Sequence, residues 1–211
     1  MSFIVFEGLD GSGKSSLMAA LEKELTQRNI QFHHTREPGG TRLSEEIRNM
    51  ILRKEGPSPL PRTELLLYVA SRAQHVEEVI APTLNSGRWV LCDRFTASSV
   101  AFQGGGREIK ESDVHALNTF ATGGLQPDLT VLLDLSVEES RRRRQGRGEA
   151  NGESEDRIES EADSFHEKVR QSFLRQAKAD ESKWLVLDAQ NTPEVLFKQL
   201  LQVLADRKIL V

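Results

Sequence analysis

The sequence predicts an α/β protein with a doubly wound, parallel, five-stranded sheet and helices on both faces. Three observations support this fold class. Short apolar runs alternate with longer amphipathic runs, the short runs are apolar on both faces, and no repeat or interdomain linker interrupts them. The length of 211 residues suits one domain. We therefore expect a single domain over residues 1–211, with ligands bound beyond the carboxyl ends of the strands.

The expected elements follow one another in the order that this fold requires. Strands are predicted at 3–7 (FIVFE), 32–35 (FHHT), 89–92 (WVLC), 129–135 (LTVLLDL) and 184–187 (WLVL). Helices are predicted at 14–28, 44–53, 63–84, 112–121, 137–144, 161–179 and 193–204. Residues 141–161 break this rhythm, because they are rich in charge, glycine and small polar residues. We expect this segment to be a mobile, Arg-rich excursion outside the core.

Composition limits the classes of function. Hydrophobic residues make up 37% and charged residues 28% of the chain, as in soluble globular proteins. The net charge of −4 argues against a nucleic-acid-binding surface. The single cysteine, Cys92, excludes an internal disulfide and indicates a reducing compartment. The opening MSFIVFEG lacks the features of a signal peptide, and no apolar run approaches the ~20 residues of a membrane span. We expect a cytoplasmic protein with no nucleic-acid or membrane partner.

A phosphate-binding loop is predicted directly after the first strand. GLDGSGKSS fits the pattern G-x-x-x-x-G-K-[ST], between a strand-like run and a helical one. Its backbone N–H groups and the following helix N-terminus would hold the phosphates of a nucleoside triphosphate. Lys14 would reach the β and γ phosphates, and the Ser15 hydroxyl would bind Mg²⁺. The alternative is an ordinary glycine-rich turn. The expected ATP-binding residues are Gly8, Leu9, Asp10, Gly11, Ser12, Gly13, Lys14, Ser15 and Ser16.

Two further stretches indicate a second site that faces this loop. TREPGGT, Thr35–Thr41, follows the second strand at its carboxyl end, where it would face the same crevice. Tyr68 and Arg72 lie four positions apart in a helical run and therefore share a helix face. An aromatic ring beside a guanidinium suits a flat, hydrogen-bonding nucleobase. The alternatives are a plain turn for the first stretch and a core aromatic for the second.

The stretch VLCDRFTASSVAFQGGG, Val90–Gly106, adds a carboxylate and a cation to the crevice. Asp93 ends an apolar strand, where phosphoryl-transfer enzymes place the carboxylate that holds the metal through water. Arg94 follows at once, and its guanidinium suits bidentate contact with a phosphate. The alternative is a purely structural, buried Asp–Arg pair.

Together these stretches resemble the thymidylate kinases, P-loop nucleoside monophosphate kinases that convert dTMP to dTDP with ATP. The resemblance extends from FEGLDGSGKSS to WLVLDA near the carboxyl end, and it is closest to bacterial members. TREPGGT, the Y-x-x-x-R helix, DRFTASS and the later DRIE occur in the family's order. It implies ATP and dTMP as substrates, Mg²⁺ as cofactor and a homodimer.

The resemblance implies which residues contact the thymine base. Tyr68, which is usually Phe in the family, would stack on the ring. Arg72 would bond a base carbonyl, and Ser99 and Gln103 would contact the polar edge of the base.

The resemblance also implies contacts to the sugar and the acceptor phosphate. Glu37 and Asp10 match carboxylates near the deoxyribose 3′-hydroxyl and the metal. Arg48 and Arg94 match arginines that hold the acceptor phosphate in line with the ATP γ-phosphoryl group. Phe102 stands where many relatives have a Tyr near the sugar 2′ position, so this departure bears on the selection for deoxyribose.

The run Arg141–Arg144 has three interpretations: a basic targeting or nucleic-acid patch, an exposed helix face, or part of a lid that closes over ATP. Some thymidylate kinases carry a catalytic Arg inside the phosphate loop, and residues 10–12 here provide none. A lid arginine would supply that charge, by analogy with arginine fingers. Arg147 and Arg157, in the segment expected as the lid over residues 141–161, are the candidates.

These residues predict transfer of the ATP γ-phosphoryl group to the 5′-phosphate of dTMP. The acceptor phosphate is already ionised, so positioning and charge neutralisation would suffice. A nucleoside kinase is disfavoured, since an uncharged hydroxyl needs a base more than cations. A GTPase-like switch is disfavoured because the chain contains no N-K-x-D. The expected catalytic residues are Lys14, Asp10, Arg94, Arg147 and Arg157.

Overall fold

The computed structural model describes residues 1–151 and 155–210, with backbone alone for residues 147–151. Five strands of this part form one sheet: β1 (Phe3–Glu7), β2 (Phe32–Arg36), β3 (Trp89–Asp93), β4 (Leu129–Asp134) and β5 (Trp184–Asp188). Their order is β2-β3-β1-β4-β5, and every neighbouring pair is parallel. The fold class predicted from the sequence is confirmed.

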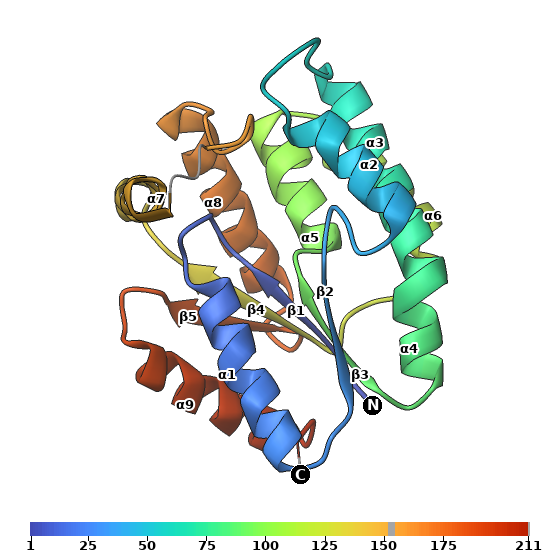
Figure 1. Cartoon of the computed structure of the whole chain (residues 1–211), viewed down its shortest axis with the longest axis vertical. Coiled ribbons are helices and arrows are strands. Elements are labelled where there is room, and N and C mark those ends of the chain that lie inside the picture. The colour runs from blue at the N-terminus through green and yellow to red at the C-terminus, as the bar shows by residue number, and fades with distance from the viewer. Residues whose placement is uncertain (152–154, 211) are drawn as a thin grey trace.

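The helices connect these strands and cover both faces of the sheet (Figure 1). The α-helices are α1 (Lys14–Gln27), α2 (Arg42–Leu52), α3 (Pro61–His75), α4 (Ala81–Asn85), α5 (Thr96–Ser99), α6 (Glu111–Thr122), α7 (Val137–Asn151), α8 (Asp163–Ala179) and α9 (Pro193–Asp206). Two π-helical segments, η1 (Val76–Ile80) and η2 (Val100–Gly106), continue α3 and α5. None of the helices in the described part is long and apolar enough to cross a membrane.

The central strand shows how the sheet builds two cores. Side chains alternate along β1, so Ile4 and Phe6 pack with α1 and α9 on one face. Phe3 and Val5 point to the other face, where they pack against η1 and Phe95. A further cluster joins β4 to α8 and η2 on this second face. Burial on both faces explains why the strand reads FIVFE, without polar alternation.

The helical run predicted at 63–84 begins earlier and is divided. Pro61 occupies the first turn of α3, where its missing N–H costs nothing. The ladder widens in η1, where the Ala81 N–H bonds the Val76 carbonyl, directly before Pro82. Because Pro82 donates no hydrogen bond, the widened turn and α4 carry the chain past it.

Residues 96–106 are helical although the sequence did not predict a helix there. The run Gly104–Gly106 has poor helix propensity, which hides the element from a local pattern. Tertiary packing explains it: a Cβ on Gly105 would lie 2.8 Å from the Ser172 Cβ, and one on Gly106 would meet the Phe165 ring. The glycines therefore allow α8 to pack closely against η2.

The segment predicted as an excursion is partly ordered against the body of the protein. Helix α7 continues to Asn151, past the predicted end at residue 144. The Arg144 side chain is buried, and Ile158 packs in the cluster that contains Phe165 and Val169. The expectation that the whole segment lies outside the core was therefore wrong at these residues.

Candidate active site

The phosphate loop turns sharply between β1 and α1. Gly8, Gly11 and Gly13 have φ values of 135°, 79° and 96°, which residues other than glycine rarely adopt. A Cβ on Gly8 would lie 2.5 Å from the Leu133 carbonyl oxygen of β4, so only glycine fits there. This geometry lets successive N–H groups of the loop face one anion at the N-terminus of α1.

Lys14 and Asp10 place opposite charges inside the loop. The Lys14 Nζ donates to the carbonyl oxygens of Gly8 and Leu9, both at 3.2 Å, and lies 3.9 Å from the Asp10 Oδ1. Burial and the neighbouring Arg94 lower the pKa of Lys14. Burial opposes ionisation of Asp10, but Arg94 and Lys14 together hold its pKa well below the usual range. Asp10 is therefore ionised at neutral pH.

Arg94 bridges the loop and the second site from a strained backbone position. Its φ of 69° is left-handed, which is uncommon for a non-glycine residue. The guanidinium Nη2 donates to the Asp10 Oδ1 at 2.9 Å, and Nη1 donates to the Ser98 Oγ at 3.3 Å. Its Cζ lies 5.1 Å from the centre of the Phe102 ring. Burial lowers the pKa of Arg94, but Asp10 and the neighbouring carboxylates outweigh burial and raise the pKa overall.

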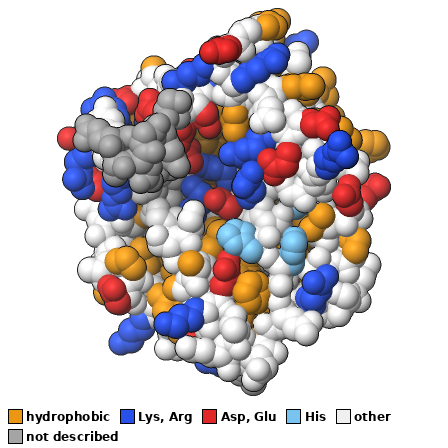
Figure 2. Space-filling view, viewed as in Figure 1, with side chains coloured by type: hydrophobic (Ala, Val, Ile, Leu, Met, Phe, Trp, Pro, Cys, Tyr) orange, Lys and Arg blue, Asp and Glu red, His pale blue; other side chains and the backbone are white. Residues whose placement is uncertain are grey.

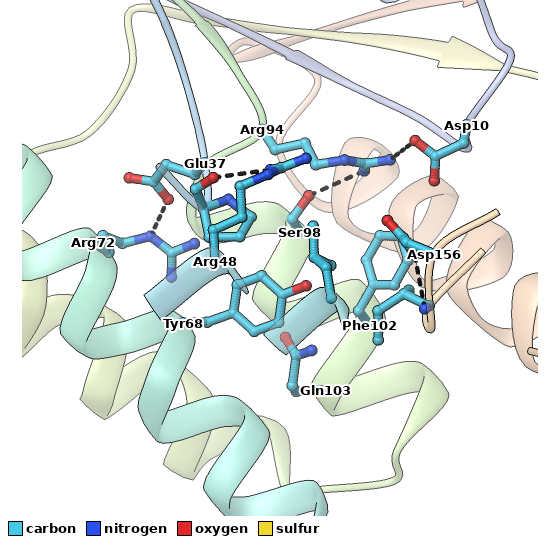
Figure 3. Close-up of a pocket in the computed structure, with 13 residues that line it drawn as sticks. Asp10, Glu37, Arg48, Tyr68, Arg72, Arg94, Ser98, Phe102, Gln103 and Asp156 are labelled. Carbon is cyan, nitrogen blue, oxygen red and sulfur yellow. Dashed lines mark hydrogen bonds and ion pairs between the residues drawn. The ribbon is translucent and has the colours of Figure 1, made fainter. Parts of the chain in front are cut away.

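A pocket opens beside the phosphate loop. Basic and acidic side chains gather near the middle of this face (Figure 2), and the close-up shows them converging from different elements (Figure 3). The predicted residues that line it are Asp10, Glu37, Arg48, Tyr68, Arg72, Arg94, Phe102 and Gln103. The remaining lining residues are Pro38, Leu52, Ser98, Asp156 and Ile158.

Arg72 is fixed at the back of the pocket by four hydrogen bonds. Its Nε donates to the Glu37 Oε2 at 2.7 Å, and Nη1 donates to the Ser99 Oγ at 2.9 Å and the Asn118 Oδ1 at 2.7 Å. Nη2 donates to the Phe95 carbonyl oxygen at 2.9 Å. Ser99 of the predicted base-contacting set is therefore buried beside Arg72 and does not line the pocket.

Glu37 is held on its other side by a buried histidine. The His75 Nδ1 lies 3.1 Å from the Glu37 Oε1, and its Nε2 lies 2.6 Å from the Thr35 Oγ1. Since a carboxylate only accepts, the His75 Nδ1 is the donor to Glu37. Glu37 thus keeps one orientation toward the pocket.

The two predicted metal ligands lie at the end of β3 and in the first turn of α1. The Asp93 Oδ1 at the end of β3 is buried and has no hydrogen-bond partner among the described residues. The Ser15 hydroxyl is exposed in the first turn of α1. An unpartnered carboxylate oxygen and a free hydroxyl are hard oxygen ligands that suit Mg²⁺ with bound water.

The sequence and fold agree with those of known proteins. The thymidylate kinase family model matches residues 6–200. A thymidylate kinase of Bdellovibrio bacteriovorus is 75% identical over 100% of this chain and 98% of its own length, and one of Pelobacter propionicus is 43% identical over 97% and 94%. The crystal structure of thymidylate kinase from Ehrlichia chaffeensis matches with a TM-score of 0.76 and 29% identity, over 96% of this chain and 98% of that one. This chain belongs to the thymidylate kinase family.

Thymidylate kinases are ATP-using enzymes, so this chain is a transferase that phosphorylates dTMP in dTTP synthesis. Its reaction joins two anionic substrates. Arg94 contacts Asp10 of the phosphate loop and also lines the pocket.

The arginine-rich helix of this thymidylate kinase packs directly on the phosphate loop. The Ser140 hydroxyl donates to the Asp10 carbonyl oxygen at 2.7 Å, and the Arg143 Nη1 donates to the Gly11 carbonyl oxygen at 3.4 Å. Arg143 also donates to the Ala189 carbonyl oxygen, and Arg144 donates to the Ser140 hydroxyl. This part of the arginine run is therefore a contact surface for the loop.

The two predicted lid arginines differ in what the structure describes. Arg147 lies in the last turns of α7, and its side chain is outside the described part. Arg157 is largely buried: its Nε donates to the Ile51 carbonyl oxygen at 2.8 Å, and its Nη2 donates to the Glu64 Oε2 at 2.6 Å. In this arrangement Arg157 joins the DRIE segment to α2 and α3, and it does not line the pocket.

The DRIE segment forms a capping box that explains its residues. The Asp156 Oδ1 accepts from the N–H groups of Ile158 and Glu159, both at 2.8 Å. The Glu159 Oε2 accepts in return from the Asp156 N–H at 3.1 Å. This turn presents Asp156 and Ile158 to the pocket, where the motif alone gave no reason to place them.

Two buried carboxylates of the site were missed by the sequence reasoning. Glu7 accepts from the N–H groups of Phe95 and Ser98 and from the Ser98 hydroxyl, below Arg94. Burial raises its pKa to about 7 against the opposing effect of Arg94. Glu64 accepts from side chains of η2 and the DRIE segment. Their partners lie 39 to 93 residues away, so no local pattern reveals them.

Proposed function

We propose that dTMP occupies the pocket and that the phosphate loop, Gly8–Ser16, holds Mg²⁺-bound ATP for transfer to the dTMP 5′-phosphate. The observation that carries this proposal is the position of Arg94, which contacts Asp10 of the loop while it lines the pocket. A cation between two anionic substrates lowers the repulsion that opposes in-line attack. Lys14 neutralises charge from the loop side.

The phosphate of dTMP would lie at the arginine-rich end of the pocket. Arg48 reaches this end from α2, where its Nη1 donates to the Pro38 carbonyl oxygen at 2.9 Å. Burial and the neighbouring Arg36 lower its pKa. Because Arg48 and Arg94 line one cavity, they can hold the two sides of one phosphate.

The base would lie at the other end, against Tyr68, Arg72 and Gln103 (Figure 3). Tyr68 offers the ring face for stacking. Arg72 keeps one Nη2 hydrogen beyond its four bonds to described residues, and this hydrogen can donate to a base carbonyl. Ser99 would act through Arg72, since it holds that guanidinium in place.

The sugar would lie between them. Glu37 and Asp10 are the carboxylates near its 3′-hydroxyl, and Phe102 faces its 2′ position. Phe102 packs against Phe165 and Phe173, so this wall carries no hydroxyl. Mg²⁺ would be held by the Ser15 hydroxyl and, through water, by Asp93, and it would polarise the transferring phosphoryl group.

A lid arginine is proposed to complete the charge neutralisation, and Arg147 and Arg157 remain the candidates by resemblance.

We also propose a homodimer. Its support is an exposed apolar set on adjacent helices, comprising Leu43 and Met50 of α2, Leu66 of α3 and Phe120 of α6. These helices lie on one side of the molecule (Figure 1).

The acceptor-phosphate site is tested by replacing Arg48. Arg48→Ala removes charge-assisted bonds to the phosphate, each worth about 1.5–3 kcal/mol, so we expect the Kd of dTMP to rise about 10- to 100-fold. Titration calorimetry with dTMP alone gives this Kd without requiring turnover.

Arg42→Ala is the matched control, because Arg42 lies exposed at the start of the same helix. It should leave the Kd unchanged. Equal Kd values for both variants and the unmodified chain would contradict the proposed orientation of dTMP.

A further inference from the structure

Glu64 is a fully buried carboxylate at the start of α3, and three side chains donate hydrogen bonds to it. Its Oε1 accepts from the Gln103 Nε2 at 2.9 Å and the Arg107 Nε at 3.2 Å. Its Oε2 accepts from the Arg107 Nη2 at 3.1 Å and the Arg157 Nη2 at 2.6 Å. Four donors fill the lone pairs of an ionised carboxylate.

This carboxylate is ionised at neutral pH. Burial raises its pKa, but hydrogen bonds from Arg107, Gln103 and Arg157 outweigh burial and lower the pKa overall. An ionised carboxylate only accepts hydrogen bonds. The Gln103 amide must therefore turn its Nε2, which is its donor end, toward Glu64.

The other end of the Gln103 amide is thereby fixed as well. Its Oε1 receives no hydrogen bond from any residue that the structure describes, and Gln103 lines the pocket with Tyr68 and Arg72. Figure 3 shows this amide next to the Tyr68 ring. The pocket thus combines an acceptor, the Gln103 Oε1, with a donor on Arg72.

We propose that Glu64 is a positioning residue for base selection, because it orients the Gln103 amide so that Oε1 faces the acceptor base. This inference rests on the proposed place of dTMP in the pocket. Thymine offers a carbonyl oxygen beside the N3–H, which matches a donor beside an acceptor. Cytosine offers an amino group beside an unprotonated N3, which reverses both.

Glu64 also holds the DRIE segment, which forms one side of the pocket. The Arg157 guanidinium that it holds donates to the Ile51 carbonyl oxygen, and the neighbouring Asp156 and Ile158 line the pocket. One carboxylate therefore connects α3, η2 and the DRIE segment. If Glu64 only held these segments together, its replacement would change stability alone. As a positioning residue, it also affects which base is accepted.

The test is Glu64→Gln, with kcat/KM measured for dTMP and dCMP. The two arginines would take the oxygen of the introduced amide, so the NH₂ group of that amide would face Gln103 and reverse the Gln103 side chain. The kcat/KM ratio of dTMP to dCMP should then fall about 10- to 100-fold, as expected for one reversed hydrogen bond at a base edge.

Arg107→Met is the matched control, because it removes two bonds to Glu64 but leaves its charge. It should lower the melting temperature and keep the ratio. If Glu64→Gln fails to fold, the pair Glu64→Gln with Arg107→Gln removes a charge with its partner and carries the same expectation.

A variant that loses stability but retains the full dTMP-to-dCMP ratio would overturn the inference. Failure of the underlying pocket assignment would look different, because replacing Gln103, which lines the pocket, would then leave the dTMP-to-dCMP ratio unchanged. Gln103→Met should lower that ratio whether or not Glu64 sets the amide, because it removes the acceptor itself.

Discussion

At the scale of single residues, the site depends on side chains whose orientations are fixed by buried partners. Arg94 reaches Asp10 from a left-handed backbone position, and Arg72 is held by four acceptors. Such preorganisation lowers the entropy lost when charged substrates bind and when charge moves during transfer.

Glu7 gives this arrangement a pH dependence. Folding raises its pKa from 4.5 to about 7, so the folded chain binds more protons than the unfolded chain between those values. The free energy of unfolding therefore falls by up to about 3 kcal/mol as pH rises through this window. Glu7→Gln removes this contribution. Urea unfolding at pH 5 and pH 8 should show the unmodified chain losing stability relative to the variant, and a constant difference would contradict the shift.

The sequence predicts some residues of the site directly, some only through the family resemblance, and others not at all. Lys14 and Ser15 belong to a contiguous motif whose spacing follows from its chemistry, so the residues alone predict them. Arg48 and Gln103 came only from resemblance to a family. Glu7 and Glu64 were missed, because a buried carboxylate is defined by donors that the fold brings from distant segments.

At the scale of elements, the contact between α7 and the phosphate loop links the arginine run to the proposed ATP site. Sequence composition favoured an early helix end and an excursion, because Gly146 and Gly148 lower helix propensity. Contacts of Ser140 and Arg143 with the phosphate loop, and of Arg144 with Glu155, support the helix instead.

Gly11→Ala tests this contact. Its Cβ would lie 3.1 Å from the Arg143 Cβ and 3.2 Å from the Ser140 carbonyl oxygen, and its φ is 79°. The left-handed backbone costs about 1–2 kcal/mol and the crowding about 1–3 kcal/mol more, and the KM for ATP should rise. Denaturant unfolding and ATP titration measure both effects.

Gly87→Ala is the matched control, since its φ is 82° and nothing lies within 4 Å of its Cβ. It should show the backbone cost alone, with an unchanged KM for ATP. Equal effects of the two substitutions on stability and on KM would argue against a close α7–loop contact.

At the scale of the whole molecule, the sheet gathers the loop, Arg94 and the TREPGG turn at one edge because parallel strands end together. That arrangement follows from alternating apolar and amphipathic runs, and the sequence predicts it well. The proposed dimer surface cannot be predicted from that alternation. Exposed apolar residues occur singly on many proteins, so the sequence does not show which of them form an interface.

The proposed homodimer is tested at Phe120, which is 85% exposed on α6. Phe120→Ser should shift the sedimentation equilibrium of the enzyme from dimer to monomer at micromolar concentration, because it removes a large apolar contact. Val195→Ser, on α9 away from this surface, should leave the dimer intact. A monomeric unmodified enzyme, or no effect of Phe120→Ser, would contradict the assignment.

The proposed reaction requires the pocket to place the 5′-phosphate of dTMP next to the γ-phosphoryl group of ATP bound at the loop. The most direct measurement is ADP production from ATP and Mg²⁺ with dTMP, dUMP, dCMP, AMP, ribonucleotide TMP, thymidine or no acceptor. We predict rapid turnover with dTMP, little with thymidine or without an acceptor, and a rate with ribonucleotide TMP that reports on Phe102. ADP production that is equally fast without an acceptor, or faster with thymidine than with dTMP, would contradict the account.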